Sequence, residues 1–316
     1  MTTGNVGFIF PGQGSQKIGM LAEIANDNAV VLETYSEASA ALGYDLWALS
    51  QTGEAEAINQ TEVTQPLLLT ASTALWRLWV ARDGARPSIL AGHSLGEWSA
   101  LVCAGVLDFA DAVRMVRNRG KYMQSAVPPG KGSMAAIIGL DDDAVRGACE
   151  QSSDAGVVVP VNFNSVGQVV IAGETEAVDR AVAACKEAGA RRAALLPVSA
   201  PFHTELMRPA AELLAEDLAA VSFHSPQIPI LHNVTVAEQS DPALIRNQMI
   251  EQITAPVPWV ATVETLKKRG VNQLVECGPG KVLGGLIKRI DKEIVTQSID
   301  TPESFNASFQ DGSGRA

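Results

Sequence analysis

The pentapeptide Gly92-His93-Ser94-Leu95-Gly96 is the feature that most restricts the fold of this chain. It has the G-x-S-x-G spacing of a nucleophile elbow, a tight turn that carries a serine from a buried strand into a helix. The apolar run 88–91 predicts that strand, and residues 97–104 predict that helix. The two glycines let neighbouring backbone approach closely, and a helix N-terminus under Ser94 would offer N–H groups to a developing oxyanion. The alternative interpretation is a glycine-flanked turn with an ordinary surface serine.

Composition limits the classes of protein to which the chain can belong. Its 316 residues are 47% hydrophobic but only 5% aromatic, which suits helices packed on a buried parallel sheet. The net charge of -11 argues against a nucleic-acid partner. The four cysteines are scattered without a C-x-x-C pair, so neither a metal site nor a disulfide framework is expected.

The first residues and the hydropathy pattern indicate where in the cell the protein is expected. Residues 1–5 contain no basic region and precede no long apolar stretch, so we expect no signal peptide. No apolar run reaches the length that spans a bilayer. We therefore expect a cytoplasmic protein without a membrane partner.

The order of predicted elements favours an α/β fold with a hydrolase-like parallel-sheet core. A strand at 6–10 leads into the glycine-rich loop 11–16, helices dominate 19–82, and Asp108 is placed to cap a helix that continues toward Met123. Further on, the pattern predicts short strands and helices in alternation; these are a helix after His203, strands at 228–231, 273–276 and 294–299, and helices at about 242–253 and 258–269. The polar, glycine-rich residues 301–316 are expected to be disordered.

The rhythm of the sequence changes between residues 133 and 196. Predicted strands and helices there follow the order β-α-β-β-α-β, which is the ferredoxin-like pattern; they lie at 134–138, 141–150, 157–161, 168–172, 174–188 and 192–196. We therefore expect a ferredoxin-like subdomain over 128–198, inserted into a discontinuous core made of 1–127 and 199–316.

A serine nucleophile needs a base, and four histidines are available. His203 lies downstream of Ser94, which is the chain order of elbow hydrolases, and a stiff proline-containing loop carries it. His93 neighbours the serine, but adjacent side chains on an elbow point apart. His224 stands among polar residues and His232 ends a short strand. His203 is the favoured base, with His93 and His232 left as alternatives.

Six segments in the same order resemble the bacterial malonyl-CoA:acyl carrier protein transacylase family, across roughly residues 5–300. They are Phe-Pro-Gly-Gln-Gly-Ser-Gln at 10–16, Gly-His-Ser-Leu-Gly-Glu at 92–97, Val-Arg-Asn-Arg-Gly-Lys-Tyr-Met-Gln at 116–124, Val-Asn-Phe-Asn-Ser at 161–165, Pro-Phe-His at 201–203 and Gly-Pro-Gly-Lys-Val-Leu at 278–283. The differences are small: tryptophan follows the elbow glutamate where tyrosine is usual, and Phe202 precedes the histidine where close bacterial relatives often have serine.

The resemblance implies roles for the residues around the elbow. Ser94 would be the acylated nucleophile, His203 its general base, and Gln252 would orient the histidine through its backbone carbonyl in place of a triad carboxylate. Gln13 and Leu95 would supply the oxyanion-hole N–H groups. The glycine-rich loop that holds Gln13 lacks the spacing of a phosphate-binding loop, so we interpret it as part of the oxyanion site.

The resemblance also implies how the acyl group is recognised. The planar guanidinium of Arg119 would bind the free carboxylate of a malonyl group in a bidentate manner. Without the family, a helix-surface cation would be the favoured interpretation of Arg119. Asn162 would line the same pocket, with a turn position at a strand end as its alternative role.

The expected reaction is ping-pong transfer of malonyl from malonyl-CoA to holo acyl carrier protein, by a monomer that needs no metal or redox cofactor. The carrier is expected to be acidic, as this chain is, so docking would require a local basic patch. Lys281, Lys288 and Arg289 are candidates for it, and a plain solvated face is the alternative. Other possibilities are acyl transfer in polyketide assembly or in malonate decarboxylase, a thioesterase, and a non-catalytic scaffold that binds acyl carriers.

Overall fold

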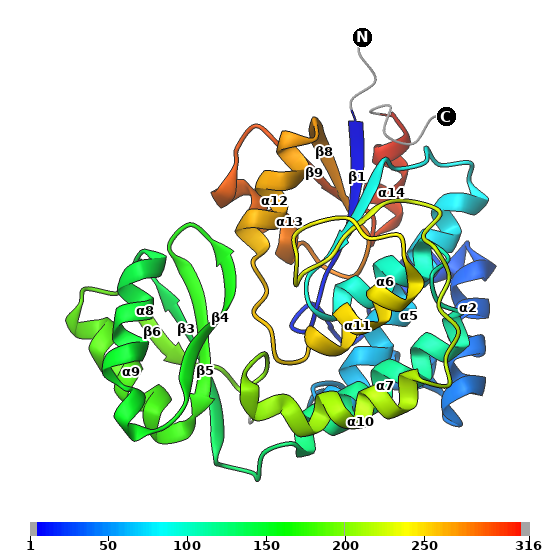
Figure 1. Cartoon of the computed structure of the whole chain (residues 1–316). Helices are drawn as coiled ribbons and strands as arrows, with labels where there is room; N and C mark the ends of the chain where they lie inside the picture. Colours follow the sequence, from blue (N-terminus) through cyan, green and yellow to red (C-terminus); the bar gives the residue numbers. More distant parts are fainter. Residues whose placement is uncertain (1–4, 199, 311–316) are drawn as a thin grey trace.

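Two β-sheets organise the chain, whose computed structural model describes residues 5–198 and 200–310 (Figure 1). The larger sheet has five parallel strands in the order β7-β2-β1-β8-β9. These strands are β1 (Asn5–Phe10), β2 (Ile89–Gly92), β7 (Ile230–Leu231), β8 (Val271–Glu276) and β9 (Val295–Ser298). The α/β class and the parallel core predicted from the sequence are confirmed.

Helices surround this sheet, as the apolar strands require. Alternate residues of β1 point to opposite faces, so Phe8 and Phe10 enter one buried cluster and Ile9 enters another. The helices of this larger body are α1 (Ala22–Asn26), α2 (Ala29–Leu42), α3 (Leu46–Thr52), α4 (Ala55–Ile58), α5 (Thr61–Ala81), α6 (Leu95–Cys103), α7 (Phe109–Ser125), α10 (Arg208–Leu218), α11 (Pro242–Glu251), α12 (Trp259–Lys268), α13 (Val282–Ile290) and α14 (Pro302–Gln310). As predicted, the Asp108 side chain caps α7.

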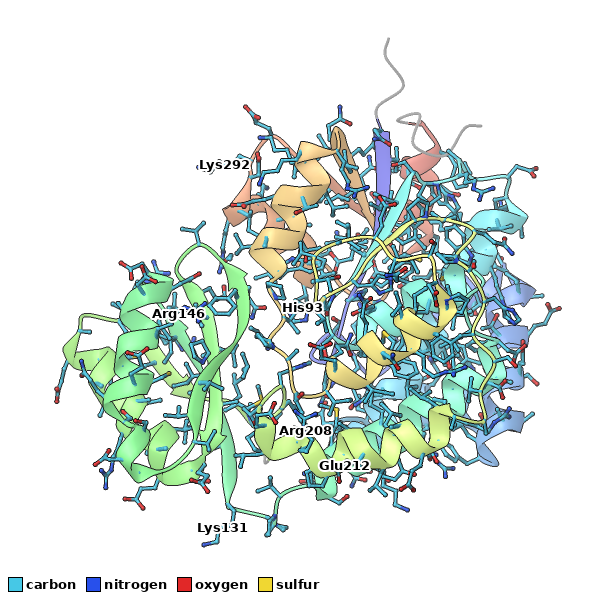
Figure 2. The ribbon with its side chains drawn as sticks, viewed as in Figure 1. His93, Lys131, Arg146, Arg208, Glu212 and Lys292 are labelled. Atoms are coloured by element: carbon cyan, nitrogen blue, oxygen red, sulfur yellow. The ribbon has the colours of Figure 1, made fainter. Side chains whose placement is uncertain are left out.

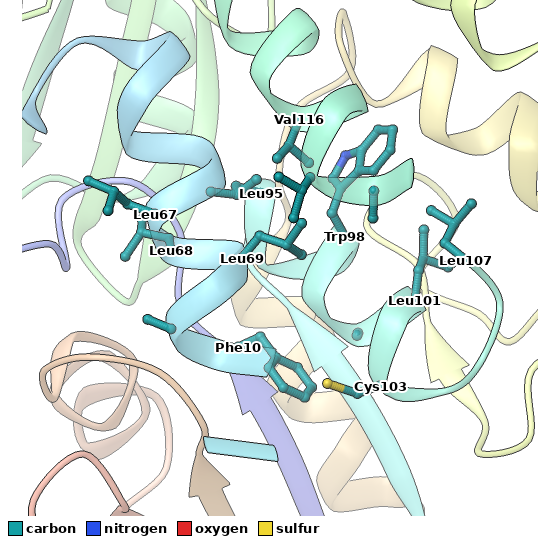
Figure 3. Close-up of a cluster of buried hydrophobic side chains, with 14 of the residues drawn as sticks. Phe10, Leu67, Leu68, Leu69, Leu95, Trp98, Leu101, Cys103, Leu107 and Val116 are labelled. Atoms are coloured by element: carbon teal, nitrogen blue, oxygen red, sulfur yellow. The ribbon is translucent and has the colours of Figure 1, made fainter. Parts of the chain in front are cut away.

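The core beneath the elbow is densely apolar. Figure 3 shows Leu95 and Trp98 of α6 packed among leucines of α5 and beside Val116 of α7. Trp98 is fully buried. The first turns of α6 are therefore held by packing on one side and by the sheet on the other, which makes the elbow a rigid platform for a side chain at residue 94.

The smaller sheet is antiparallel and has the strand order β4-β5-β3-β6. Its elements run along the chain as β3 (Gly132–Ile138), α8 (Asp142–Gln151), β4 (Val158–Ser165), β5 (Gln168–Glu174), α9 (Thr175–Glu187) and β6 (Arg192–Leu195). Both helices pack on this sheet around a separate apolar cluster, seen in green at the left of Figure 1.

Backbone hydrogen bonds attach the smaller sheet to the larger body. The segment at Val257, just before α12, donates to the Val161 carbonyl and accepts from the Phe163 amide of β4, at 2.7 and 3.0 Å. Arg289 at the end of α13 donates to the side chain of Gln168. At the same junction, His93, which directly follows β2, lies 2.8 Å from Asn164 of β4.

The chain beyond residue 300 corrects one prediction. Pro302–Gln310 forms α14 rather than a disordered tail, because Phe305 is buried and both Phe305 and Phe309 pack against Trp79. Residues 311–316, for which we also predicted disorder, lie outside the described residues. Within the described ranges, none of the helices is long and apolar enough to cross a lipid bilayer.

Candidate active site

The elbow is a strained turn that the neighbouring backbone permits. Ser94 adopts φ 51° and ψ -107°, a conformation that L-residues rarely occupy. A Cβ on Gly92 would lie 2.0 Å from the Gly96 carbonyl carbon, and one on Gly96 would lie 1.9 Å from the Phe10 oxygen. Only glycine fits at these two positions, so the close approach expected from the pentapeptide is present.

Asn233 holds the two sides of this turn. Its Oδ1 accepts a hydrogen bond from the Ser94 amide at 2.8 Å, and its Nδ2 donates to the Gly92 carbonyl at 2.7 Å. Asn233 lies just beyond β7, which pairs with β2 in parallel, so both strands deliver their carboxyl ends to the same edge of the sheet. The fully buried amide thereby stabilises a backbone conformation that would otherwise be unfavourable.

His203 is the histidine that faces the serine. Its Nε2 lies 2.8 Å from Ser94 Oγ. Its Nδ1 lies 3.0 Å from the carbonyl oxygens of both Gln252 and Ala255. Because carbonyl oxygens only accept hydrogen bonds, Nδ1 carries the proton, and the lone pair of Nε2 points at the serine hydroxyl. Gln252 is the C-cap of α11, where the last carbonyl groups have no N–H donor within the helix and are free to accept from His203.

The surroundings of His203 keep its imidazole neutral. Burial, together with the nearby positive charge of Arg119, lowers its pKa to about 3, against the opposing effect of the Gln252 carbonyl. A neutral imidazole with a free Nε2 lone pair can take a proton from Ser94 without first losing one.

The other histidines are engaged elsewhere. His93 bonds Asn164 of β4 through its Nε2 at 2.8 Å, and Figure 2 shows it between the small sheet and the larger body. Fully buried His232 directs its Nδ1 to Glu97. His224 is exposed. Of the four histidines, His203 is the one in hydrogen-bond contact with Ser94, whereas His93 and His232 bond other residues.

Arg119 of α7 is buried, with 2% of its surface exposed, and is therefore not a helix-surface cation. Its Nη1 donates to Gln65 at 2.9 Å, and its Nη2 donates to Gln252 Oε1 at 3.0 Å and to Ser94 Oγ at 3.3 Å. Burial lowers its pKa to about 10, while the negative charge of Glu97 has the opposite effect. The guanidinium consequently remains charged at neutral pH, close to the serine hydroxyl.

Two features of Arg119 would allow its guanidinium to bind an anion. Among the described residues, its buried Nε has no hydrogen-bond partner. The ion pairs found in the same part of the chain include none with Arg119. A buried cation with an unpaired donor is costly unless a ligand completes its coordination.

Gln13 and Leu95 both border the serine. Leu95 is the first residue of α6, where backbone N–H groups lack an acceptor within the helix. The loop that holds Gln13 approaches the elbow because Gly12 has no Cβ; such an atom would lie 2.6 Å from the His93 oxygen. The Gln13 side chain itself reaches Thr61 at 3.4 Å.

A cavity of about 130 Å³ lies over the serine at the junction of the two sheets. Its walls combine polar groups near Ser94 with apolar groups from the small sheet and from the segments before and after residue 199. The lining residues include Gln13, Gln65, Leu95, Arg119, Met123, Met134, Asn162, Leu196, Val198, Phe202 and His203. Asn162 Oδ1 is buried and has no partner among the described residues. Pockets that enclose whole drug-sized ligands measure roughly 300–1,000 Å³, so this cavity suits a short acyl group.

Sequence reasoning missed several residues of this site. Glu97, Asn233 and Gln65 contact the predicted residues directly, and Ala255 shares the His203 proton with Gln252. One signal was available for Asn233: a polar pair follows an apolar strand, and strand ends meet at the same edge of a parallel sheet.

The acyl transferase domain family matches residues 7–292, which places the protein in the class of acyltransferases. A relative from Salmonella typhimurium, named malonyl CoA-acyl carrier protein transacylase, is 57% identical over 302 residues, or 96% of this chain and 98% of the relative. The chain therefore belongs to the malonyl CoA-acyl carrier protein transacylase family.

Solved structures agree with this membership. An acyl carrier protein S-malonyltransferase from Vibrio cholerae is 53% identical, with a TM-score of 0.94 over 96% of this chain and 99% of that chain. A malonyl-transacylase solved in complex with a type II polyketide acyl carrier protein is 51% identical, with a TM-score of 0.96 over 97% of this chain and 99% of that chain.

Proposed function

We propose that this chain transfers a malonyl group from malonyl-CoA to the phosphopantetheine thiol of acyl carrier protein, through a malonyl ester of Ser94. The observation that carries this proposal is the buried Arg119 guanidinium, 3.3 Å from Ser94 Oγ and without a carboxylate partner in the described part of the chain. A short acyl group that ends in a carboxylate fits both the volume of the cavity and its charge.

The acylation step follows from the positions of the side chains. Ser94 Oγ attacks the thioester carbonyl carbon and gives its proton to His203 Nε2, while the Leu95 and Gln13 amides stabilise the oxyanion. The tetrahedral intermediate then breaks its bond to sulfur, and the imidazolium returns the proton to the CoA thiolate. In the second half of the cycle, His203 takes the proton of the carrier thiol, whose sulfur attacks the ester and releases Ser94.

Substrate binding also improves the base. The positive charge of Arg119 disfavours the imidazolium of His203, as its effect on the pKa of His203 indicates. A malonyl carboxylate paired with Arg119 offsets that charge, so the pKa of His203 rises once the correct substrate is bound. Proton transfer from Ser94 is then easier in the complex than in the free enzyme.

The direct test is to weigh the intact protein after incubation with malonyl-CoA, with and without holo acyl carrier protein. We expect a malonyl adduct that persists without the carrier and disappears when the carrier thiol is added. Rapid release of CoA without a carrier would indicate a thioesterase, and the absence of any adduct would indicate a scaffold. Polyketide assembly is the second candidate setting, because a similar malonyl-transacylase was solved with a type II polyketide carrier.

Replacing His203 with alanine should slow acylation by about 10²–10⁴-fold, the usual effect of removing a general base. Pre-steady-state acylation rates measure this loss. His93→Ala is the matched control, because His93 bonds Asn164 rather than the serine and its loss should cost much less. Near-normal acylation in the His203 variant would contradict the assignment.

The pH dependence of kcat/KM for acylation should show an unusually low acid limit. A base works when it is deprotonated, so a pKa lowered from 6.5 to about 3 extends activity toward acid. We expect kcat/KM for malonyl-CoA to remain nearly constant as the pH falls through 6.5, under conditions where the fold is intact by circular dichroism. A tenfold loss of rate for each pH unit below about 6.5 would contradict a neutral, buried His203.

We also propose the finer organisation of the chain. The β-α-β-β-α-β order and the strand order β4-β5-β3-β6 support a ferredoxin-like subdomain over 128–198, inserted between core segments 1–127 and 199–316; the boundary residue 199 lies outside the described residues. We further infer a cytoplasmic monomer, which gel filtration and cell fractionation test. For carrier docking, Lys281, Lys288 and Arg289 are all exposed, and Arg289 also donates a hydrogen bond to Gln168.

A further inference from the structure

Glu97 is a buried carboxylate that the reaction described above does not use. It lies in the first turn of α6, three residues after Ser94, and 1% of its surface is exposed. Its two oxygens face three nitrogen donors. Oε1 accepts from His232 Nδ1 at 2.7 Å, and Oε2 accepts from the Asn233 amide at 3.2 Å and from Gln252 Nε2.

Two of these three partners touch the reacting groups directly. Asn233 bonds the Ser94 amide and the Gly92 carbonyl, which lie just before the Ser94 side chain in the backbone. Gln252 is a branching point: its backbone carbonyl accepts from His203, its Oε1 accepts from Arg119, and its Nε2 also donates to the Ser94 carbonyl at 3.1 Å. Nucleophile, base and arginine are thus each one hydrogen bond away from a residue that Glu97 holds.

Glu97 determines which of two orientations the Gln252 side-chain amide adopts. A side-chain amide can be turned by 180°, which exchanges its oxygen and nitrogen. Because an ionised carboxylate only accepts hydrogen bonds, Glu97 requires Nε2 on its own side and therefore leaves Oε1 toward Arg119. In the opposite orientation, the amide NH2 group would face the guanidinium, donor against donor, and Arg119 would lose this partner.

We propose that Glu97 is a positioning residue for malonyl recognition, which fixes the orientation of the Gln252 side chain and, through it, the direction of the Arg119 guanidinium toward the acyl pocket. This inference rests on the proposed function of Ser94 and Arg119. The essential contribution of Glu97 is an acceptor that reaches Gln252, rather than its charge, since Glu97 itself is not in hydrogen-bond contact with Arg119 in the described structure.

Two conservative substitutions of Glu97 separate the effect of side-chain length from the effect of charge. Glu97→Gln keeps the length of the side chain, and its Oε1 can still accept from Gln252 if His232 changes its tautomer to accept from the new amide. Glu97→Asp keeps the charge but is one methylene shorter, which withdraws the acceptor from Gln252. The quantity to measure is the malonyl-to-acetyl ratio of kcat/KM for acylation, since acetyl-CoA shares every step except the contact with Arg119.

We expect the malonyl preference to fall about tenfold in Glu97→Asp and to stay within about threefold of wild type in Glu97→Gln. The matched control is Glu276→Asp. Glu276 is an equally buried carboxylate that accepts the Leu283 and Gly284 amides at 2.9 and 2.8 Å, away from the acyl pocket. Its shortening should lower the melting temperature without changing the malonyl-to-acetyl ratio.

A double-mutant cycle tests whether Glu97 acts through Gln252. Gln252→Leu removes the side-chain amide but keeps the backbone carbonyl on His203, so adding Glu97→Asp to it should cause little further loss of preference. Equal losses in both backgrounds, an unchanged ratio in Glu97→Asp, or loss in Glu97→Gln with retention in Glu97→Asp would each overturn the inference. Wild-type protein that forms no malonyl ester would instead refute the proposed function, so that measurement comes first.

Discussion

Replacement of Ser94 by alanine should abolish malonyl transfer, with a loss of about 10⁶-fold in the acylation rate. In the described residues, the Ser94 hydroxyl is the one hydroxyl in hydrogen-bond contact with His203, at 2.8 Å. Without it, the base, the oxyanion site and Arg119 remain, but no atom is placed to form the ester. Intact-mass measurement after incubation with malonyl-CoA should show no adduct on the Ser94→Ala protein.

Ser99→Ala provides the matched control for this experiment. Ser99 lies in α6, the helix that begins directly after Ser94, and is fully buried, and its hydroxyl has no partner among the described residues. Its loss should therefore leave the malonyl adduct and the transfer rate nearly unchanged. A malonyl adduct that persists on Ser94→Ala would show that another residue is the nucleophile.

The fold was predictable where the chain forms local patterns. The predicted strand at 6–10 is an apolar run whose inner residues are buried on both faces, and the predicted strand at 273–276 lies within β8. The helix at 302–310 was missed because the surrounding residues are polar, whereas its order comes from Phe305 and Phe309 reaching Trp79. Two aromatic residues four positions apart form one helical face, but their partner is more than 200 residues away in the sequence.

The site was predictable where one motif defines its own geometry. The elbow pentapeptide and the chain order of Ser94 and His203 indicate their pairing. Glu97 and Asn233 meet because β7 pairs with β2; the sequence predicts a strand at 228–231, but it does not show which strand lies beside it. Arg119 is buried because Gly120 lets α7 approach α5 closely; a Cβ there would lie 2.5 Å from the Thr61 oxygen. Helical periodicity alone contains no such information.

Replacement of Arg119 by alanine should reverse the acyl specificity of the enzyme. In wild type, acetyl-CoA leaves the buried guanidinium without an anion, whereas malonyl-CoA supplies the carboxylate for its unpaired Nε. Sites built to bind a polar group reject analogues that lack it by about 10⁴–10⁵-fold. In Arg119→Ala, the malonyl carboxylate is the group left unpaired in a buried pocket, so the malonyl-to-acetyl ratio of kcat/KM should collapse and invert.

A comparison of the acyl preference of Arg119→Lys with that of Arg119→Ala separates the contribution of charge from that of the shape of the guanidinium. Arg119→Lys keeps a positive charge, but all the donors of lysine lie on one ammonium nitrogen. That nitrogen cannot keep the contacts with Gln65 and Gln252 and also bind a carboxylate in a bidentate manner. We therefore expect Arg119→Lys to recover little of the malonyl preference. Arg117→Ala, a charge loss two residues earlier on α7 and outside the walls of the cavity, should leave the ratio unchanged. If malonyl preference survives in Arg119→Ala and falls in Arg117→Ala, the carboxylate is bound by Arg117, and the geometry around Ser94 has been assigned to the wrong cation.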